Sequence, residues 1–258
     1  MLKSRIIPCL LVHKGGLVKT VQFNQHKYVG DPINAVKIFN EKEVDELIVL
    51  DIDATVEGRE PNFELIKNLA IECRMPFCYG GGVTKVEQAK KIIELGAEKV
   101  AISSSAVYNK ALLKEISNVV GVQSVVVVID AKKTSSFFNS NYEVYTHNGK
   151  KASGKKLIDW VRELEEIGIG EIVINSIDND GMMKGYDLTL VDQVRSNCTV
   201  PITVIGGAAS LDDIKSLIHR YKVIGAGAGS LFVFKGKYKA VLISYPDHDS
   251  KDIMQIFK

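Results

Sequence analysis

The chain has 258 residues, of which 46% are hydrophobic and 25% are charged, a composition that is typical of a folded globular protein and excludes a disordered chain. Its net charge of +2 does not indicate a nucleic-acid-binding or membrane-binding surface, and no apolar run reaches the roughly 18–20 residues that span a bilayer. The four cysteines include no C-x-x-C pair, which argues against a disulfide scaffold and a zinc site. Free thiols without a signal peptide predict a protein of the reducing cytoplasm, and no metal or cofactor motif is visible.

Eight short apolar segments recur along the chain, and most of them lack the alternation of a half-exposed strand. They are therefore predicted to be strands that are buried on both faces. The predicted strands cover residues 5–12, 46–51, 76–79, 99–102, 124–130, 171–175, 202–205 and 222–225.

Longer amphipathic segments lie between these strands and are predicted to be helices. Asp31-Pro32 and Ser210 are suitable helix starts, and Gly96 and Gly168 are suitable helix ends. The predicted helices cover residues 32–43, 62–73, 85–95, 110–117, 154–166, 189–195 and 211–219. Strands in strict alternation with helices over about 250 residues predict a TIM (β/α)8 barrel as one domain, with a doubly wound open sheet as the competing architecture.

The two halves of the chain carry a similar motif. Residues 76–84 read PFCYGGGVT and residues 201–210 read PITVIGGAAS, so each has a proline, an apolar strand and a Gly-Gly turn. A second turn of small residues follows at the same spacing in both halves, 23 residues further along. The offset of 125 residues between the two copies predicts a duplicated half-barrel, and coincidence among glycine-rich loops is the alternative.

These paired turns are candidate anion sites. A strand that ends in Gly-Gly lets backbone N–H groups approach an anion closely, and the helix after it adds the positive end of its dipole. Two phosphate sites are therefore predicted on opposite edges of one mouth, at Gly81 with Ser104 and at Gly206 with Ser230. A substrate with a phosphate at each end follows as a hypothesis, and the alternative is that these glycines only permit tight turns.

Carboxylates follow several of the predicted strands, at the end that forms the active-site mouth of a TIM barrel. An aspartate there acts as an acid or base or orients a hydroxyl, and helix capping or a loop salt bridge is the alternative. Asp130 is the best placed, because it closes the fifth predicted strand. Lys19 is predicted to meet an anion or to be a solvated surface lysine. The candidate carboxylates are Asp51, Asp53, Asp130, Asp178 and Asp180.

A second charge pattern lies at the opposite end of the predicted barrel. Arg5, Glu46, Lys99 and Glu171 stand at or just before the starts of four strands. Their side chains are predicted to converge as a ring of paired charges, because an isolated buried charge is costly. Composition and spacing leave two interpretations open: a plug that closes the bottom of the barrel, and a gate on a passage through it.

The motifs resemble one family, the cyclase subunit of imidazole glycerol phosphate synthase, over residues 1 to about 234. This family is a TIM barrel of histidine biosynthesis, and its ring of Arg, Glu, Lys and Glu matches Arg5, Glu46, Lys99 and Glu171. The resemblance implies that the ring gates ammonia from a glutaminase subunit docked at the N-terminal face. The matching motifs are R-I-I-x-C-L at 5–10, G-D-P at 30–32, D-E-L at 45–47, L-D-I at 50–52, G-G-G at 80–82, V-V-V-V-I-D-A-K at 125–132, D-W-V at 159–161, S-I-D-x-D-G at 176–181, G-Y-D at 185–187 and G-G-A at 206–208.

The resemblance also implies the residues that hold a phosphorylated or nucleotide-linked small molecule. Of the family's two catalytic aspartates, one matches Asp130 and the other falls at Leu11, which cannot carry a proton. General acid–base catalysis is worth about 10²–10⁴-fold, so this loss should cripple imidazole formation. Other departures from the family pattern are Ser103, Ser104, Asn175, Met182 and Ile205. The implied binding residues are Lys19, Asp51, Gly81, Gly82, Ser103, Ser104, Asn175, Asp180, Gly181, Gly206, Gly207, Gly229 and Ser230.

These departures are similar to those of a paralogous branch that is associated with acetamidino modification of N-acetylated sugars, in lipopolysaccharide O-antigen or flagellar glycans. That branch implies a glutaminase subunit and a separate sugar amidotransferase as partners. Imidazole glycerol phosphate synthesis and a non-catalytic scaffold are the alternatives. Residues 135–151 are predicted to form a hairpin beside the mouth, and the tail 235–258 a new partner surface. The branch motifs are P-C-L-L at 8–11, G-L-V-K-T at 16–20, Y-V-G-D-P-I-N-A at 28–35, G-R-E-P-N at 58–62 and F-V-F-K-G at 232–236.

Overall fold

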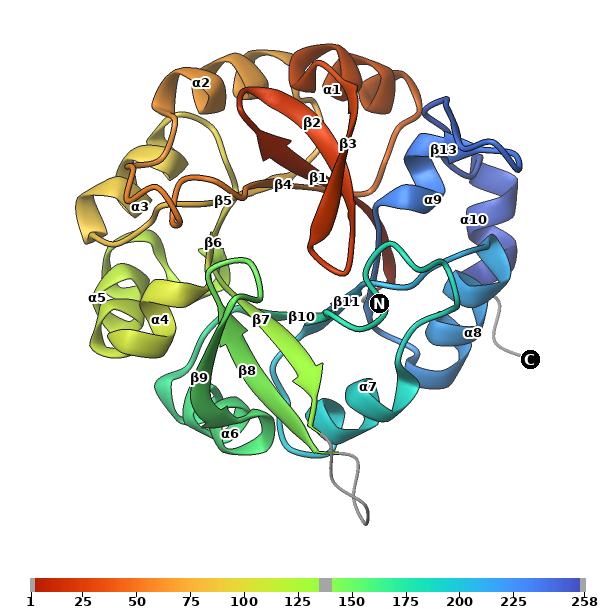
Figure 1. Ribbon diagram of the computed structural model, residues 1–258. Helices are drawn as coiled ribbons and strands as arrows, with labels where there is room; N and C mark the ends of the chain where they lie inside the picture. The colour runs from red at the N-terminus through yellow and green to blue at the C-terminus, as the bar shows by residue number, and fades with distance from the viewer. Residues whose placement is uncertain (1–2, 135–140, 256–258) are drawn as a thin grey trace.

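The computed structural model describes residues 3–134 and 141–255, and these form a closed ring of eight parallel strands surrounded by helices (Figure 1). The ring strands are β1 (Arg5–His13), β4 (Leu47–Asp51), β5 (Phe77–Gly80), β6 (Lys99–Ile102), β7 (Val125–Lys133), β10 (Glu171–Ser176), β11 (Ile202–Ile205) and β12 (Gly225–Ala228). They follow one another around the ring in this order. Parallel pairing of β7 with β10 and of β12 with β1 completes it, so the predicted TIM (β/α)8 barrel is confirmed.

The outer layer consists of helices that begin at well-defined caps. Asp31, Asn62, Asp187 and Ser210 each accept a hydrogen bond from the backbone N–H three residues further on, which satisfies a donor that the helix itself leaves free. All seven predicted helices are present, with ends that differ by at most three residues. The helices are α1 (Pro32–Glu41), α2 (Phe63–Glu72), α3 (Val86–Glu94), α4 (Ser104–Tyr108), α5 (Ala111–Val120), α6 (Leu157–Ile167), α7 (Leu188–Arg195), α8 (Leu211–Tyr221), α9 (Ser230–Val233) and α10 (His248–Gln255), with a 3₁₀ turn η1 (Val122–Ser124).

The last predicted strand is wrong in position. Residues 222–225 were expected to be a strand because of their apolar run, but β12 begins only at the last of them. Lys222 ends α8 with a φ of 67°, which is a left-handed conformation that a strand does not contain. The true strand reads Gly-Ala-Gly-Ala and therefore lacks the β-branched residues on which the sequence prediction relied.

Close packing explains why β12 contains so little side chain. A Cβ atom added to Gly225 would lie 1.8 Å from Oγ1 of Thr203, and one added to Gly227 would lie 2.2 Å from Cγ2 of Ile205. Both neighbours belong to β11. The glycines are thus required because the side chains of the adjacent strand occupy the space beside them.

Two hydrophobic regions hold the barrel together. The larger lies between the strands and the helices and includes the fully buried Trp160, Phe39 and Leu217. The smaller fills the inside of the ring, where alternate side chains of each strand point inward. The interior residues are Ile7, Cys9, Ile48, Cys78, Ala101, Val126, Val128, Val173 and Ile205.

Two antiparallel hairpins extend ring strands beyond the barrel (Figure 1). The first consists of β2 (Gly16–Val21) and β3 (Asn24–Gly30) and pairs with β1; the second consists of β8 (Tyr142–Thr146) and β9 (Lys151–Lys156) and pairs with β7. The hairpin predicted over 135–151 is thus correct for β8, whereas its partner strand β9 occupies the start of the segment predicted as a helix. Residues 135–140 lie outside the described residues.

The tail returns to the N-terminal end of the barrel. After a short ribbon of β13 (Phe234–Lys235) and β14 (Ala240–Val241), α10 packs against α8. Tyr245 anchors this return: its hydroxyl donates to the carbonyl of Ile6 at 2.8 Å and accepts from the backbone N–H of Asp45 at 3.2 Å. Lys251 on α10 adds an ion pair of 3.0 Å with the Asp45 carboxylate.

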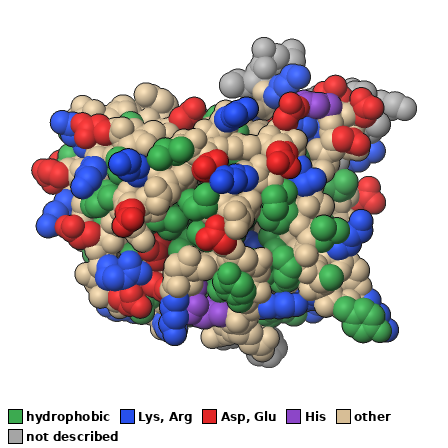
Figure 2. Space-filling model, turned by 90° about the horizontal axis from the view of Figure 1, so that it is seen from above, with side chains coloured by type: hydrophobic (Ala, Val, Ile, Leu, Met, Phe, Trp, Pro, Cys, Tyr) green, Lys and Arg blue, Asp and Glu red, His purple; other side chains and the backbone are tan. Residues whose placement is uncertain are grey.

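The outer surface carries no field of a single sign on the side seen in Figure 2, where acidic and basic side chains are interspersed. Among the helices of the described residues, none combines the length and the hydrophobicity needed to cross a bilayer.

The anchoring role of Tyr245 is testable. Tyr245→Phe leaves a carbonyl and an N–H without their partner and should lower the free energy of unfolding by about 1–3 kcal/mol. Urea unfolding of the variant measures the loss. Tyr238→Phe is the matched control, because Tyr238 is 90% exposed; an equal effect of both substitutions would contradict this account.

Candidate functional site

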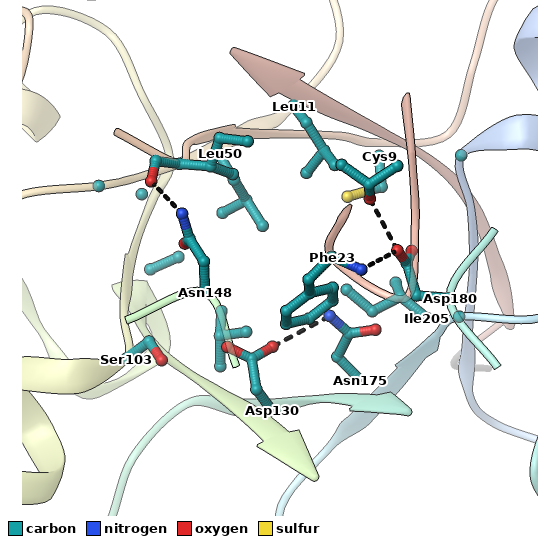
Figure 3. Close-up of a pocket in the computed structure, with 18 of the residues that line it drawn as sticks. Cys9, Leu11, Phe23, Leu50, Ser103, Asp130, Asn148, Asn175, Asp180 and Ile205 are labelled. Atoms are coloured by element: carbon teal, nitrogen blue, oxygen red, sulfur yellow. Dashed lines mark hydrogen bonds between the residues drawn. The ribbon is translucent and has the colours of Figure 1, made fainter. Parts of the chain in front are cut away.

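The C-terminal ends of the strands enclose a pocket of about 150 Å³ (Figure 3). All the predicted binding residues and Asp130 line this pocket, whereas the candidate carboxylates Asp53 and Asp178 do not; the roles of the lining residues in binding stay predictions. They come from seven ring strands or the loops after them and from β2, so they are distant in sequence. These residues are Lys19, Asp51, Gly81, Gly82, Ser103, Ser104, Asp130, Asn175, Asp180, Gly181, Gly206, Gly207, Gly229 and Ser230.

The two Gly-Gly turns face each other across the pocket, because β5 and β11 are four strands apart in a ring of eight. Gly81 and Gly206 have φ values of 126° and 88°, which favour glycine. A Cβ on Gly81 would also lie 2.4 Å from the carbonyl oxygen of Asp51, so tight packing requires this glycine independently of any ligand. The helices that start at Ser104 and Ser230 have only five and four residues, and their dipoles are correspondingly small.

Asp130 and Asn175 form a hydrogen-bonded pair at the pocket wall. They stand opposite each other on β7 and β10, and Nδ2 of Asn175 donates to Oδ1 of Asp130 at 3.0 Å. Burial raises the pKa of Asp130 to about 7; the bond from Asn175 acts in the other direction, and the charge of Asp180 adds to the rise. Asp130 is therefore suited to give and take a proton near neutral pH.

The wall opposite Asp130 is aliphatic. Leu11 lies near the end of β1, which is four strands away from β7 around the ring, and the side chains of Leu11 and Asp130 lie on opposite sides of the pocket in Figure 3. Cys9, Leu50 and Ile205 line the pocket with it. Position 11 holds a leucine rather than an acid. Of the two facing positions, only that of Asp130 therefore supplies a group that can transfer a proton.

Lys19 is buried at the pocket rim, with 5% of its surface exposed, so the interpretation as a solvated surface lysine is wrong. Its Nζ donates to the carbonyl of Cys9 and would lie 2.7 Å from a Cβ on Gly229. Burial lowers the pKa of Lys19, and the nearby Asp180 carboxylate raises it in part. Lys19 is thus placed beside the small-residue turn after β12, where an anion was predicted.

Asp180 ties the first hairpin to the loop after β10. Its Oδ2 accepts hydrogen bonds from Oγ1 of Thr20 at 2.7 Å and from the N–H of Phe23 at 3.2 Å. Burial raises the pKa of Asp180 despite these bonds. The carboxylate therefore has a structural partner on the hairpin as well as access to the pocket.

The other candidate carboxylates cap loops. Oδ1 of Asp51 accepts from the backbone N–H groups of Asp53 and Ala54, at 3.0 and 3.1 Å. Asp53 itself accepts from Lys14 and pairs with His13, both at 2.7 Å. These bonds match the capping alternative of the sequence analysis. Asp178 does the same by accepting from the N–H of Lys133 at 2.8 Å.

The sequence analysis missed the residues that the hairpins bring over the pocket. Phe23, at the tip of the first hairpin, packs beside Gly149 in the turn of the second, where a Cβ would lie 3.0 Å from the Phe23 ring. Asn148 in the same turn donates to the carbonyl of Ile52 at 2.7 Å. Figure 3 shows Phe23 and Asn148 projecting over the pocket from different sides. The hairpin predicted beside the mouth over 135–151 contains Asn148, whereas nothing in the sequence pattern signalled Phe23.

The four charged residues predicted for the opposite end converge into a ring. Lys99 Nζ lies 2.7 Å from Glu46 and 2.8 Å from Glu171, and Arg5 bridges the same two carboxylates, at 2.9 Å from Glu171. Burial alone raises the pKa of Glu171, but the charges of Arg5 and Lys99 outweigh it and hold that pKa below its usual value. Every charge in the ring is paired, as its burial requires.

Metal ligands do not gather in the described part of the chain, which contains no group of three or more histidine, cysteine, aspartate or glutamate side chains able to hold an ion. The ionisable groups that line the pocket include the carboxyl groups of Asp51, Asp130 and Asp180 and the buried ammonium of Lys19, beside the backbone N–H groups of the glycine turns.

The raised pKa of Asp130 predicts a pH effect on stability. Between its usual pKa of 3.8 and about 7, the unfolded chain loses the Asp130 proton while the folded chain keeps it. The stability of the wild type should therefore fall with rising pH, by up to about 1.4 kcal/mol per pH unit from this group. Asp130→Asn removes the contribution, so its stability relative to the wild type should rise between about pH 5 and about pH 7.

Urea unfolding across this pH range measures the difference between Asp130→Asn and the wild type. Asp252→Asn, on the exposed side of α10, is the control and should leave the slope of stability against pH unchanged. Parallel pH slopes for Asp130→Asn and the wild type would show that Asp130 is ionised throughout and contradict the raised pKa.

Comparisons with known proteins agree with the geometry. The family model described as "Histidine biosynthesis protein" matches residues 5–239. A provisionally named imidazole glycerol phosphate synthase subunit HisF of Leptospira borgpetersenii is 53% identical over 98% of this chain and 99% of its own length, and one of Vibrio vulnificus is 54% identical over 97% and 96%. The imidazole glycerol phosphate synthase subunit HisF of Streptococcus sanguinis is 41% identical over 90% and 91%. The chain belongs to the histidine biosynthesis protein family, among its HisF-like imidazole glycerol phosphate synthase subunits.

Proposed function

We propose that this barrel delivers ammonia from a glutaminase subunit, docked at its N-terminal face, to an acceptor at its C-terminal mouth. The observation that carries the proposal is the contrast between the two ends: the charged ring is complete, whereas Asp130 faces Leu11 in place of a second acid. Conduction of ammonia needs the charged ring, which this chain keeps. Cyclisation with two carboxylates needs a second acid opposite Asp130, and Leu11 stands there instead.

The charge distribution along the barrel axis supports the passage of neutral ammonia. The ring side chains lie at the starts of the strands, and the interior between them and the pocket contains a cluster of apolar side chains that includes Ile7, Ile48 and Val173. A charged ammonium ion pays a large desolvation cost in such an interior, whereas ammonia does not. The side chains fill the interior, so ammonia would pass through gaps that open as they move.

The N-terminal face also offers apolar surface for a partner. Ile71, Val119, Val122 and Val223 are between 47% and 69% exposed, and each lies at the end of a helix or just before a strand. Helix ends and strand starts meet at this face of a TIM barrel. Exposed aliphatic side chains on one face mark an interaction site, which supports docking of the glutaminase here.

For the acceptor, we propose an N-acetylated sugar that a separate amidotransferase converts to the acetamidino form, for lipopolysaccharide O-antigen or a flagellar glycan. In that conversion ammonia supplies the nitrogen that replaces the acetyl carbonyl oxygen, and water leaves. Leu11, Asn175 and Ile205 support this choice, since they replace polar or acidic residues of the cyclase while the ring is kept. The two facing glycine turns support a phosphate-bearing ligand at the mouth.

An isotope competition tests ammonia delivery. The barrel, the glutaminase, the amidotransferase and its sugar would be combined with glutamine labelled with ¹⁵N in the amide and with unlabelled ammonium in solution. We expect ¹⁵N to dominate the product with the wild type. Lys99→Ala should lower the ¹⁵N share roughly threefold or more, because the ring would lose the cation that bridges Glu46 and Glu171 and could no longer close, so glutamine-derived ammonia would escape into solution.

Lys90→Ala is the control, since Lys90 pairs only with Glu94 on the surface of α3 and should leave the ¹⁵N share unchanged. A wild-type product that takes nitrogen from the two sources in proportion to their concentrations would refute ammonia delivery. Binding of the glutaminase without any rise in its activity would instead favour the scaffold alternative.

Imidazole glycerol phosphate synthesis is the second candidate. It is favoured by the two glycine turns on opposite sides of the pocket, which suit a ligand with a phosphate at each end, and by the pKa of Asp130 near 7. Sequence identity of 41% to the Streptococcus sanguinis subunit supports it as well.

One assay separates the two candidates: the purified barrel, ammonium salt and the bisphosphorylated ribulosyl aminoimidazole carboxamide substrate. With Leu11 in place of an acid, we expect turnover at least about 100-fold below that of a HisF synthase subunit measured in parallel. Turnover equal to that of the synthase subunit would overturn the sugar-modification proposal and establish the second candidate.

A further inference from the structure

Thr203 touches the charged ring although it was not among the predicted gate residues. Its side chain is completely buried on β11, and its hydroxyl donates to Oε1 of Glu171 at 2.5 Å. Thr203 stands next to Gly225 and, beyond it, Arg5 in the register of the sheet. It therefore belongs to the layer of side chains that closes the N-terminal end of the barrel.

Gly225 makes this contact possible. A Cβ at Gly225 would lie 1.8 Å from the Thr203 hydroxyl oxygen, so any other residue there would displace the hydroxyl. The absence of a side chain at Gly225 thus leaves room for the Thr203 hydroxyl, a neutral donor, beside Glu171. An apolar residue of the same shape as threonine would fill the space equally well, which makes the hydroxyl itself the feature that needs an explanation.

The hydroxyl makes the two carboxylates of the ring unequal. Glu171 accepts from Thr203, from Arg5 at 2.9 Å and from Lys99 at 2.8 Å, whereas Glu46 accepts from the two cations and, among the described residues, has no neutral side-chain donor. Glu171 therefore keeps a neutral donor and a cation when Lys99 leaves. Glu46 keeps Arg5 alone.

The cations of the ring reach water, whereas its carboxylates do not. The side chains of Glu46 and Glu171 are 4% and 5% exposed, but those of Lys99 and Arg5 are 18% and 29% exposed. A lysine at this edge can turn its ammonium into water, where it is well solvated, whereas a buried carboxylate cannot leave. The cost of opening therefore depends on how well the carboxylate left behind is still hydrogen-bonded.

We propose that Thr203 is a positioning residue of the gate: its hydroxyl holds Glu171 in place, so that Lys99 can leave the ring while Glu171 stays hydrogen-bonded. This inference rests on the proposed delivery of ammonia through the ring. It assigns the moving part of the gate to Lys99 and the fixed part to Glu171 with Thr203. Gly225 is the residue that allows this arrangement.

The hydrogen bond can be tested on the isolated barrel, without any partner. Thr203→Val keeps the branched shape and removes the hydroxyl, so the pKa of Glu171, followed by ¹³C NMR of its carboxyl carbon, should rise. Thr203→Ser keeps the hydroxyl and should leave that pKa unchanged. Thr199→Val is the matched control, since Thr199 donates to the exposed Glu165 at the same distance of 2.5 Å.

Thr199→Val should raise the pKa of Glu165, whose usual value is lowered mainly by this bond, and should not affect Glu171. An unchanged Glu171 titration in Thr203→Val would overturn the positioning role. A purely structural role for Thr203 would lower the unfolding temperature of the variant without moving the titration.

The isotope competition then tests the effect on the gate. We expect Thr203→Val to lower the ¹⁵N share of the product about threefold or more while product formation from added ammonium stays at the wild-type rate, with Thr203→Ser and Thr199→Val unchanged. A wild-type ¹⁵N share in Thr203→Val would refute the inference and leave ammonia delivery intact. Loss of the ¹⁵N preference in the wild type itself would refute the proposed function, whereas the NMR titration would still decide whether Thr203 positions Glu171.

Discussion

Closure of the sheet, through parallel pairing of β7 with β10 and of β12 with β1, is the constraint on which both ends of the molecule depend. In a closed parallel ring all strand starts meet at one end and all strand ends at the other. Residues 41 to 166 positions apart, such as Arg5, Glu46 and Glu171, are brought into contact only by this closure. The same closure places Asp130 across the pocket from Leu11.

The two ends use charge in opposite ways. At the N-terminal end, burial is offset because each carboxylate of the ring has two cations. At the C-terminal end, the partner of Asp130 is the amide of Asn175 and the opposite wall is aliphatic. Burial therefore raises the pKa of Asp130 to about 7. At the first end, the charges of Arg5 and Lys99 hold the pKa of Glu171 below its usual value; at the second, Asp130 is ready to exchange a proton.

The residues that stand at the starts and ends of strands could be predicted from the sequence. Those whose contacts depend on strand register or on the path of a loop could not. Strand-end positions identified Asp130, the glycine turns and the ring, because a barrel places strand ends together. Thr203 sits inside an ordinary apolar strand, and only its register with Gly225 shows that it reaches Glu171. The Gly-Ala strand β12 carried no β-branched signal, and Phe23 reaches the pocket through a hairpin whose path the sequence pattern does not specify.

The alternation of bare and filled positions along β12 and β11 has an evolutionary consequence. Gly225 and Thr203 share one volume, and Gly227 and Ile205 share another. Neither glycine can grow unless its neighbour shrinks, because a protein interior has no spare space for an extra methyl group. The two residues of each pair should therefore change together in descendants of this chain. Such coupled substitutions would preserve the inner diameter of the barrel at these two levels.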